Sequence, residues 1–249
     1  MRSVAWLCVA LAGCGVTDPL VTVPESCRDG VIAAGMVLAT EESIPEVRDP
    51  LEVVAFLARW SLTGENRDAL IVDADVVAST GEAELPMPHA GDGVYSAADE
   101  DPAVYVSGEP WTLAIDSSLG AGTITAVAPQ DTRFVLPDPG EHPAGVELAV
   151  DLSDQGFDIA RAVVIDGVGD LVWRSIEPNV WQHHAWLRGD GPVTSVTLPA
   201  EALPEADAGY HVGIAGLVRA SPDGFDGLDP ECSVFAVGRM AVRTIRTAP

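Results

Sequence analysis

Short apolar or alternating runs, each bounded by turn residues, recur from residue 31 to residue 247, and this pattern constrains the fold most. The 249-residue chain contains 24 glycines and 19 prolines, which supply frequent turns. The sequence has no amphipathic helix with recognisable caps, and residues 200–204 form a turn at most. Short strands at this spacing predict an all-β fold of the β-sandwich type.

A proline-rich stretch at residues 137–143 divides the expected strands into two groups. Three prolines in seven residues remove backbone donors that a sheet requires. We therefore expect two consecutive β-sandwich domains, 28–136 and 144–249, joined by a linker at 137–143. The spacing in 51–60 also fits a helix, and periodicity alone does not decide. The expected strands cover residues 31–39, 51–60, 69–78, 93–96, 108–115, 123–128, 146–152, 160–165, 171–173, 193–198, 210–218 and 233–247.

One expected hairpin has a clear inner face. Trp111, Leu113 and Ile115 alternate with more polar neighbours, so their side chains should lie on one side of a strand and face the core. Residues 123–128 are the expected partner strand, reached across a glycine turn at 120–122.

The N-terminal residues have the charged start and short apolar core of an export signal. The apolar run covers only residues 4–12, whereas a helix needs about 20 apolar residues to span a bilayer. The run ends in Leu11-Ala12-Gly13-Cys14, which resembles the lipobox of bacterial lipoproteins. An ordinary secretory signal, or a buried N-terminal strand that ends in a cysteine, is the alternative.

The lipoprotein resemblance implies cleavage before Cys14, so that residues 1–13 are a signal peptide and 14–27 a lipidated tether. Several acyl chains on Cys14 would hold the protein at a membrane, because each buried CH₂ contributes about 0.8 kcal/mol. Gly15 stands where some bacteria use Asp to retain lipoproteins at the inner membrane. The family rule therefore favours the outer membrane of a bacterial cell envelope.

The charge of the chain excludes several classes of function. The formal net charge is -25, and none of the 13 basic residues is a lysine. Lysine Schiff bases and P-loop chemistry are therefore excluded. Nucleic acid is not expected as a partner, because its binding requires basic residues that neutralise phosphates. Membrane attachment should depend on the lipid, since the acidic body is repelled by an anionic surface.

Two cysteines remain once Cys8 is removed with the leader and Cys14 is acylated. Cys27 and Cys232 form an even pair in a chain sent to an oxidising compartment, and both lie in polar, proline-bearing turns. The pattern favours a disulfide between them. Two unrelated buried thiols are the alternative.

Two stretches contain candidate ligand-binding residues. The first contains Trp181, His183, His184 and Trp186, which suit a metal site or a stacking patch for sugar or peptide. Adjacent histidines on a strand point to opposite faces, so an exposed connecting loop is favoured. The second is an acidic loop of weak calcium candidates, which favours a plain loop because its spacing differs from that of an EF-hand. These candidates are Asp223, Asp226, Asp229 and Glu231.

No motif for nucleophilic or metal-dependent catalysis is found, so we assign no catalytic residue, no cofactor and no enzyme activity. Paired carboxylates of a glycan hydrolase stay open, because 38 acidic residues offer many pairs and spacing does not give their distances.

Two segments resemble each other and a known class of sandwich. Leu85-Pro86 leads to Gly93-Val94-Tyr95, and Leu203-Pro204 leads similarly to Gly209-Tyr210. This step is similar to one in transthyretin-like, carboxypeptidase-regulatory-like and immunoglobulin-like or fibronectin-type sandwiches. The run 69–127 also resembles envelope lipoproteins that have such a domain. The resemblance supports the sandwich fold more than any function. Our hypothesis for the function is a structural or binding module with an envelope protein or glycan as partner; an accessory subunit of an envelope assembly is a further alternative.

Overall fold

The computed structural model describes residues 29–40, 51–61, 69–99, 104–175, 192–222 and 227–249. The elements in these ranges are strands, apart from a short 3-10 helix at Ala200–Ala202 (η3), so the all-β prediction is confirmed. The strands are β1 Asp29–Thr40, β2 Leu51–Ser61, β3 Ala69–Leu70, β4 Asp75–Ser79, β5 Glu84–Pro86, β6 His89–Gly91, β7 Val94–Asp99, β8 Pro110–Ser117, β9 Gly120–Val127, β10 Leu148–Asp151, β11 Ile159–Asp166, β12 Leu171–Arg174, β13 Ser195–Leu198, β14 Gly209–Ala220 and β15 Val234–Arg246.

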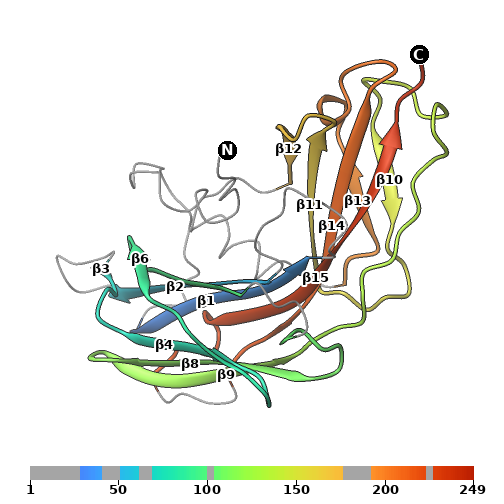
Figure 1. The fold of residues 1–249 in the computed structure, drawn as a ribbon. Helices are drawn as coiled ribbons and strands as arrows, with labels where there is room; N and C mark the ends of the chain where they lie inside the picture. The colour runs from blue at the N-terminus through green and yellow to red at the C-terminus, as the bar shows by residue number, and fades with distance from the viewer. Residues whose placement is uncertain (1–28, 41–50, 62–68, 100–103, 176–191, 223–226) are drawn as a thin grey trace.

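A nine-stranded sheet is the frame of the molecule, with the order β12-β11-β14-β15-β1-β2-β7-β6 and with β3 beside β2. β1 and β15 pair in parallel, and the other neighbours are antiparallel. We call the part of the molecule that contains β1 and β2 the lower arm, and the part that contains β11 and most of β14 the upper arm (Figure 1). β15 passes from one arm into the other. Strands from both sides of residues 137–143 therefore belong to one sheet.

Two smaller sheets pack on the same face of this frame. The sheet β5-β4-β8-β9 covers the lower arm, and the pair β10-β13 covers the upper arm. β15 contributes to both cores, with Phe235 and Val237 in the lower core and Ala241 and Ile245 in the upper core. The packing is sandwich-like in both arms, as expected.

The bend between the arms lies where the β14–β15 ladder passes from one core to the other. Leu217 pairs with Gly238, and Gly216 pairs with Arg239. A Cβ atom at Gly238 would overlap the carbonyl oxygen of Gly216, and one at Gly216 would overlap the ring of Phe157. These two glycines allow the close approach that the bend requires.

Thr132 inserts its hydroxyl into this bend from the segment that follows β9. The hydroxyl accepts a hydrogen bond from the Gly216 amide (2.9 Å) and donates one to the Arg239 carbonyl oxygen (2.7 Å). The residue is only 2% exposed. Its hydroxyl therefore satisfies two backbone groups of paired residues that are hidden from water.

The opposite face of the nine-stranded sheet, which we call the inner face, carries a third cluster of buried apolar side chains. All of its buried members lie on strands of this one sheet, and no other described element packs against them. The inner face also contains two buried charged residues, Glu52 of β2 and Arg161 of β11. Burial lowers the pKa of Arg161, and the negative charge of Glu52 acts in the opposite direction. The opposite charges of Glu52 on β2 and Arg161 on β11 therefore attract each other on the inner face.

The structure differs from the sequence predictions in a few local features. Residues 51–60 belong to a strand, so the helical alternative is wrong. The turn before β9 lies at residues 118–119 and not at 120–122, because Ser117 pairs with Gly120. Residues 137–143 contain no strand, as expected, but they pack against the end of β15 through a bridge between His142 and Thr247. The boundaries 28–136 and 144–249 stay a prediction.

The two similar segments of the sequence each contain a buried tyrosine, Tyr95 or Tyr210, that bonds to a nearby loop. Tyr95 is buried, and its hydroxyl donates to the Ile71 carbonyl oxygen (3.1 Å) and accepts from the Ala74 amide (3.0 Å). Tyr210 is also buried and accepts a hydrogen bond from the Glu205 amide (3.0 Å). Each tyrosine ties a loop to its sandwich, in the manner of a tyrosine corner.

The first prediction concerns the bend. We expect Gly238→Ala to lower the free energy of unfolding by about 3 kcal/mol, because its methyl group would overlap the Gly216 carbonyl oxygen, a backbone atom that cannot move aside as the end of a flexible side chain can. Gly209→Ala is the matched control, since nothing lies within 4 Å of the added Cβ, and it should change stability by less than about 0.5 kcal/mol. Urea denaturation measures both; equal stability of the two variants would contradict this account.

The second prediction concerns the hydroxyl at the bend. Thr132→Val keeps the volume of the side chain but leaves the Gly216 amide and the Arg239 carbonyl without their bond to it, so we expect a loss of about 2 kcal/mol. Thr197→Val, at an exposed position of β13, is the control and should cost little. A Thr132→Val chain as stable as its control in the same urea experiment would show that the hydroxyl is dispensable.

Candidate functional site: the N-terminal junction

The N-terminal junction is the place where the start of β1 lies beside residues 227–233, which lead into β15. The Val31 amide donates to the Gly227 carbonyl oxygen (3.3 Å), and the Asp229 amide donates to the Val31 carbonyl oxygen (3.0 Å). The Ser233 hydroxyl accepts from the Ala33 amide (3.1 Å) and donates to the Val31 carbonyl oxygen (3.3 Å). The beginning of the body is thus bonded to a segment 200 residues away.

Asp229 organises the turn at this junction. Its carboxylate accepts a hydrogen bond from the Glu231 amide (2.9 Å). Its carbonyl oxygen accepts hydrogen bonds from the amides of Cys232 (3.2 Å) and Ser233 (2.7 Å). The side chain is buried, as expected for a residue that satisfies backbone donors locally. The Asp229 carboxylate therefore has a structural role at the start of β15.

The calcium candidates are only partly within the described residues. Asp223 and Asp226 lie outside them, whereas Glu231 is exposed beside Asp229. The residues that the structure describes contain no group of three or more His, Cys, Asp or Glu side chains that could hold a metal ion. A calcium site on this loop stays a prediction.

Cys232 lies at the buried centre of the junction. It has no exposed surface and is disulfide-bonded, with a partner outside the described residues. Cys27 also lies outside the described residues, two positions before Asp29, where β1 begins. The pairing of Cys27 with Cys232 remains a prediction, and the bonds from Val31 to residues 227–229 bring the two chain segments close together.

The hairpin β8–β9 supports the junction from the smaller sheet. A Cβ atom on Gly122 would lie 2.8 Å from Cγ of Leu228, and one on Gly227 would lie 2.8 Å from the amide nitrogen of Ala121. Gly227 also has a φ of 105°, in the region that favours glycine. The loop can approach β9 closely only because both positions lack side chains.

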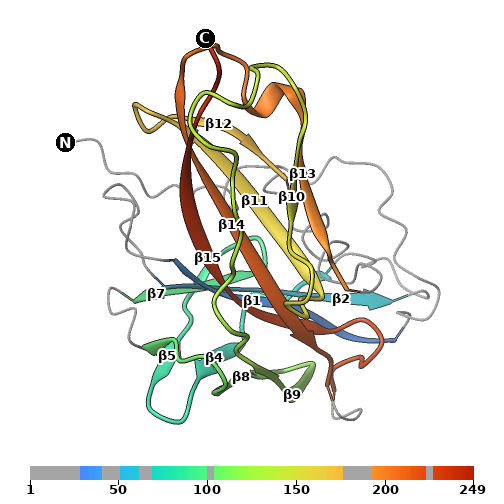
Figure 2. The ribbon, with the colours of Figure 1, turned by 90° about the vertical axis from the view of Figure 1, so that its right-hand side faces the viewer.

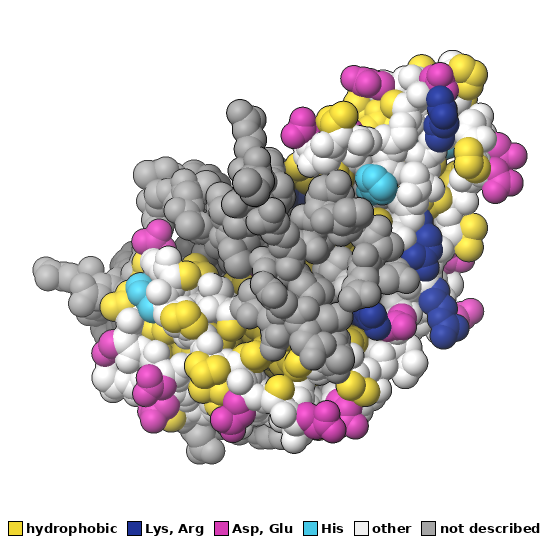
Figure 3. All heavy atoms as spheres, in the orientation of Figure 1, with side chains coloured by type: hydrophobic (Ala, Val, Ile, Leu, Met, Phe, Trp, Pro, Cys, Tyr) yellow, Lys and Arg dark blue, Asp and Glu magenta, His cyan; other side chains and the backbone are white. Residues whose placement is uncertain are grey.

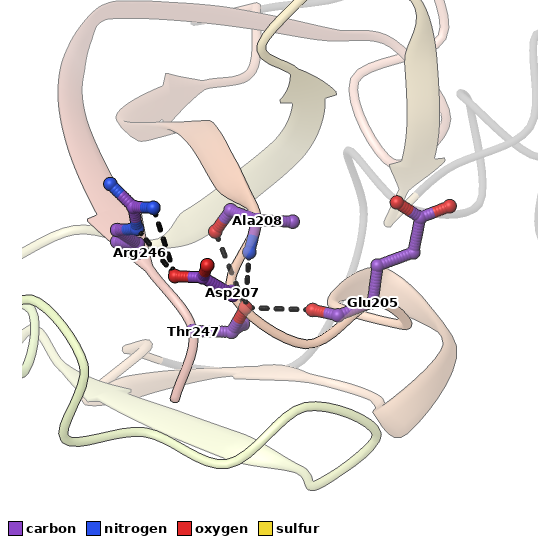
Figure 4. A network of polar contacts seen from close by, with 5 residues as sticks. All are labelled: Glu205, Asp207, Ala208, Arg246 and Thr247. Atoms are coloured by element: carbon purple, nitrogen blue, oxygen red, sulfur yellow. Dashed lines mark hydrogen bonds and ion pairs between the residues drawn. The ribbon is translucent and has the colours of Figure 1, made fainter. Parts of the chain in front are cut away.

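The chain end is fixed separately, at the far end of the upper arm. The Thr247 hydroxyl donates to the Glu205 carbonyl oxygen (2.7 Å) and accepts from the Ala208 amide (3.0 Å). Arg246 binds the Asp207 carboxylate at 2.9 Å (Figure 4). This salt bridge is exposed, so it adds little stability, and the buried Thr247 is the stronger attachment.

Charge is unevenly distributed between the arms. Every arginine side chain that the structure describes belongs to residue 133 or a later one, and Figure 3 shows arginines along the upper arm. Among the side chains that the structure describes in residues 29–128, the charged ones at the surface are acidic; the side chain of Arg59 on β2 is not among those described. These acidic residues are Asp73, Asp75, Glu82, Glu84, Asp92, Glu109 and Asp116.

The other sequence candidates lie outside the described residues. They comprise Cys14, the expected lipid attachment site, and the binding-patch candidates Trp181, His183, His184 and Trp186. No described helix is long and apolar enough to cross a membrane. Sequence reasoning missed Val31 and Ser233 as junction residues, because neither has a local motif and their contact depends on distant segments.

Comparisons with known proteins give only a distant likeness. No protein-family model and no curated protein matches the chain. Among solved structures, the chain is similar to a biofilm associated protein BSP domain, with a TM-score of 0.22 and 13% identity over 89% of this chain and 29% of that chain. It is also similar to fibronectin(III)-like modules of Clostridium thermocellum CbhA, with a TM-score of 0.20 and 9% identity over 87% of this chain and 90% of that one. These scores are too low to support an argument about function.

The third prediction concerns the cysteine pair. Non-reducing peptide mapping of the purified protein should find Cys27 joined to Cys232. Removal of the pair should destabilise the fold by about 4 to 5 kcal/mol in the loop-entropy model, because the closed loop is long. Cys8→Ala should leave the map unchanged, since residues 1–13 are expected to be removed. Free thiols at both Cys27 and Cys232 would contradict the pairing.

Proposed function

We propose that the protein is a lipoprotein of the bacterial cell envelope, held at a membrane through Cys14, and that its body is a non-enzymatic structural or binding module. The observation that supports this proposal most is the N-terminal junction. The start of β1 is bonded through Val31 and Ala33 to residues 227–233, so the chain that leaves a membrane anchor would enter a firmly fixed point of the body.

The direction of β1 sets the orientation that we propose. Thr40 at its end pairs with Met240 near the bend, so the strand begins at the end of the lower arm that is far from the bend. The C-terminus lies at the far end of the upper arm in both ribbon views (Figures 1 and 2). A tether at Asp29 would therefore hold the lower arm near the membrane and display the upper arm to a partner, an envelope protein or a glycan.

The charge of the lower arm is consistent with attachment through lipid and not through the protein surface. Its exposed carboxylates would be repelled by anionic headgroups. Residues 15–26 of the tether can extend over at most about 40 Å, so the body would stay close to its membrane. Gly15 supports a place in the outer membrane under the family rule. The glycan-hydrolase and accessory-subunit alternatives stay predictions, because no contact among the described residues favours either.

The fourth prediction tests the anchor. Cys14→Ala should abolish incorporation of labelled fatty acid and move the protein from the membrane fraction to the soluble fraction. Cys8→Ala is the matched control, because it changes the other leader cysteine and should leave labelling and membrane association intact. Unchanged membrane association of the Cys14→Ala chain, measured by fractionation after a salt wash, would refute the anchor.

A further inference from the structure

β9 is an outer strand of the smaller lower sheet, and it differs from the other outer strands in the described residues. It is eight residues long, and Figure 2 shows it at the end of the order β5-β4-β8-β9. β5, at the other edge, has three residues and includes Glu84 and Pro86. In the large sheet, β6 has three residues and a register shift, and β12 has four. Short length, charge, proline and irregularity are the usual protection of sheet edges, and β9 has none of these features.

The backbone of β9 offers a regular row of free hydrogen-bonding groups. The Ala128 amide donates to the Glu109 carbonyl oxygen (2.9 Å), so the backbone groups of Ala128 point toward the β8 side. Val127, the residue before it, is opposite Pro110, which has no amide hydrogen to donate to it. In an antiparallel pair such positions alternate, so Thr123, Thr125 and Val127 direct their N–H and C=O groups away from β8. Within the described ranges, these backbone groups have no other partner strand.

The side chains along this edge are uncharged. Thr123, Thr125 and Val127 are exposed on the outer face, and the Thr125 hydroxyl lies 2.9 Å from that of Thr112 on β8. In a chain of net charge -25, most contacts between two copies would bring carboxylates together. A contact along β9 places no carboxylate of the strand opposite another.

We propose that β9 pairs in antiparallel fashion with β9 of a second copy, about a two-fold axis through Thr125. Thr125 would then face its own counterpart, and Thr123 would face Val127 of the other copy, so the outward groups form about six hydrogen bonds. Threonine opposite threonine or a β-branched residue is a favourable cross-strand pair. Gly227 lies against Ala121, so the pairing is confined to residues 123–127. The two four-stranded sheets become one continuous sheet, with the same surface used on both copies.

This dimer does not depend on lipidation or on the proposed function, because β9 lies within the folded body. Sedimentation equilibrium of the full chain in density-matched detergent is the test. The wild-type protein should have twice the mass of its own monomer, as measured by mass spectrometry, at micromolar concentrations. Thr125→Lys places a charge on the axis, so it should raise the dimer dissociation constant at least tenfold. Thr197→Lys is the matched control at an exposed position of β13 and should behave as wild type.

A second variant tests the geometry without adding charge. Paired residues on hydrogen-bonded antiparallel strands have Cα atoms about 5.5 Å apart, within the range of a disulfide. Thr125→Cys should therefore cross-link to itself under mild oxidation, whereas Thr197→Cys should not. A wild-type monomer, a dimer that persists in Thr125→Lys, or a Thr125→Cys chain that does not cross-link would each overturn the proposal.

Discussion

The bend in the β14–β15 ladder decides how the rest of the molecule is arranged. Gly216 and Gly238 permit the two strands to approach where side chains would overlap, and Thr132 binds the backbone groups at the same place. Because both strands continue through the bend, one nine-stranded sheet provides a face for two separate cores. The direction of the upper arm, and with it the distance of the chain end from β1, follows from these few contacts.

The two sides of the bend are held by different interactions. On the outer side, the hydroxyl of Thr132 comes from the segment between the arms, so that segment is part of the packed structure. On the inner side, the buried charges of Glu52 and Arg161 attract each other between β2 and β11. The apolar clusters provide most of the stabilisation of each arm, and the Thr132 hydroxyl bonds the backbone where the arms meet.

Sequence reasoning located most strands because alternation of side chains is a local property. Trp111, Leu113 and Ile115 are buried on one face of β8, as their spacing predicts. The prediction of a single strand at 69–78 was less accurate, since the structure has two strands there, β3 and β4. Sequence reasoning did not predict the parallel pairing of β1 with β15, because no local pattern relates strands so far apart. The same reason kept Ser233 and Thr132 out of the expected site residues.

The sequence by itself determined that the chain is all β, where most of its strands lie, and that Trp111, Leu113 and Ile115 face a core. These properties depend on the period of two residues and on the conformations that glycine and proline allow. Only the tertiary structure decided that strands from both halves share one sheet, that the start of β1 is bonded to residues 227–233, and that β9 is left as an open edge. Strand partners are selected by packing across the whole core, and that information is absent from any short segment of the chain.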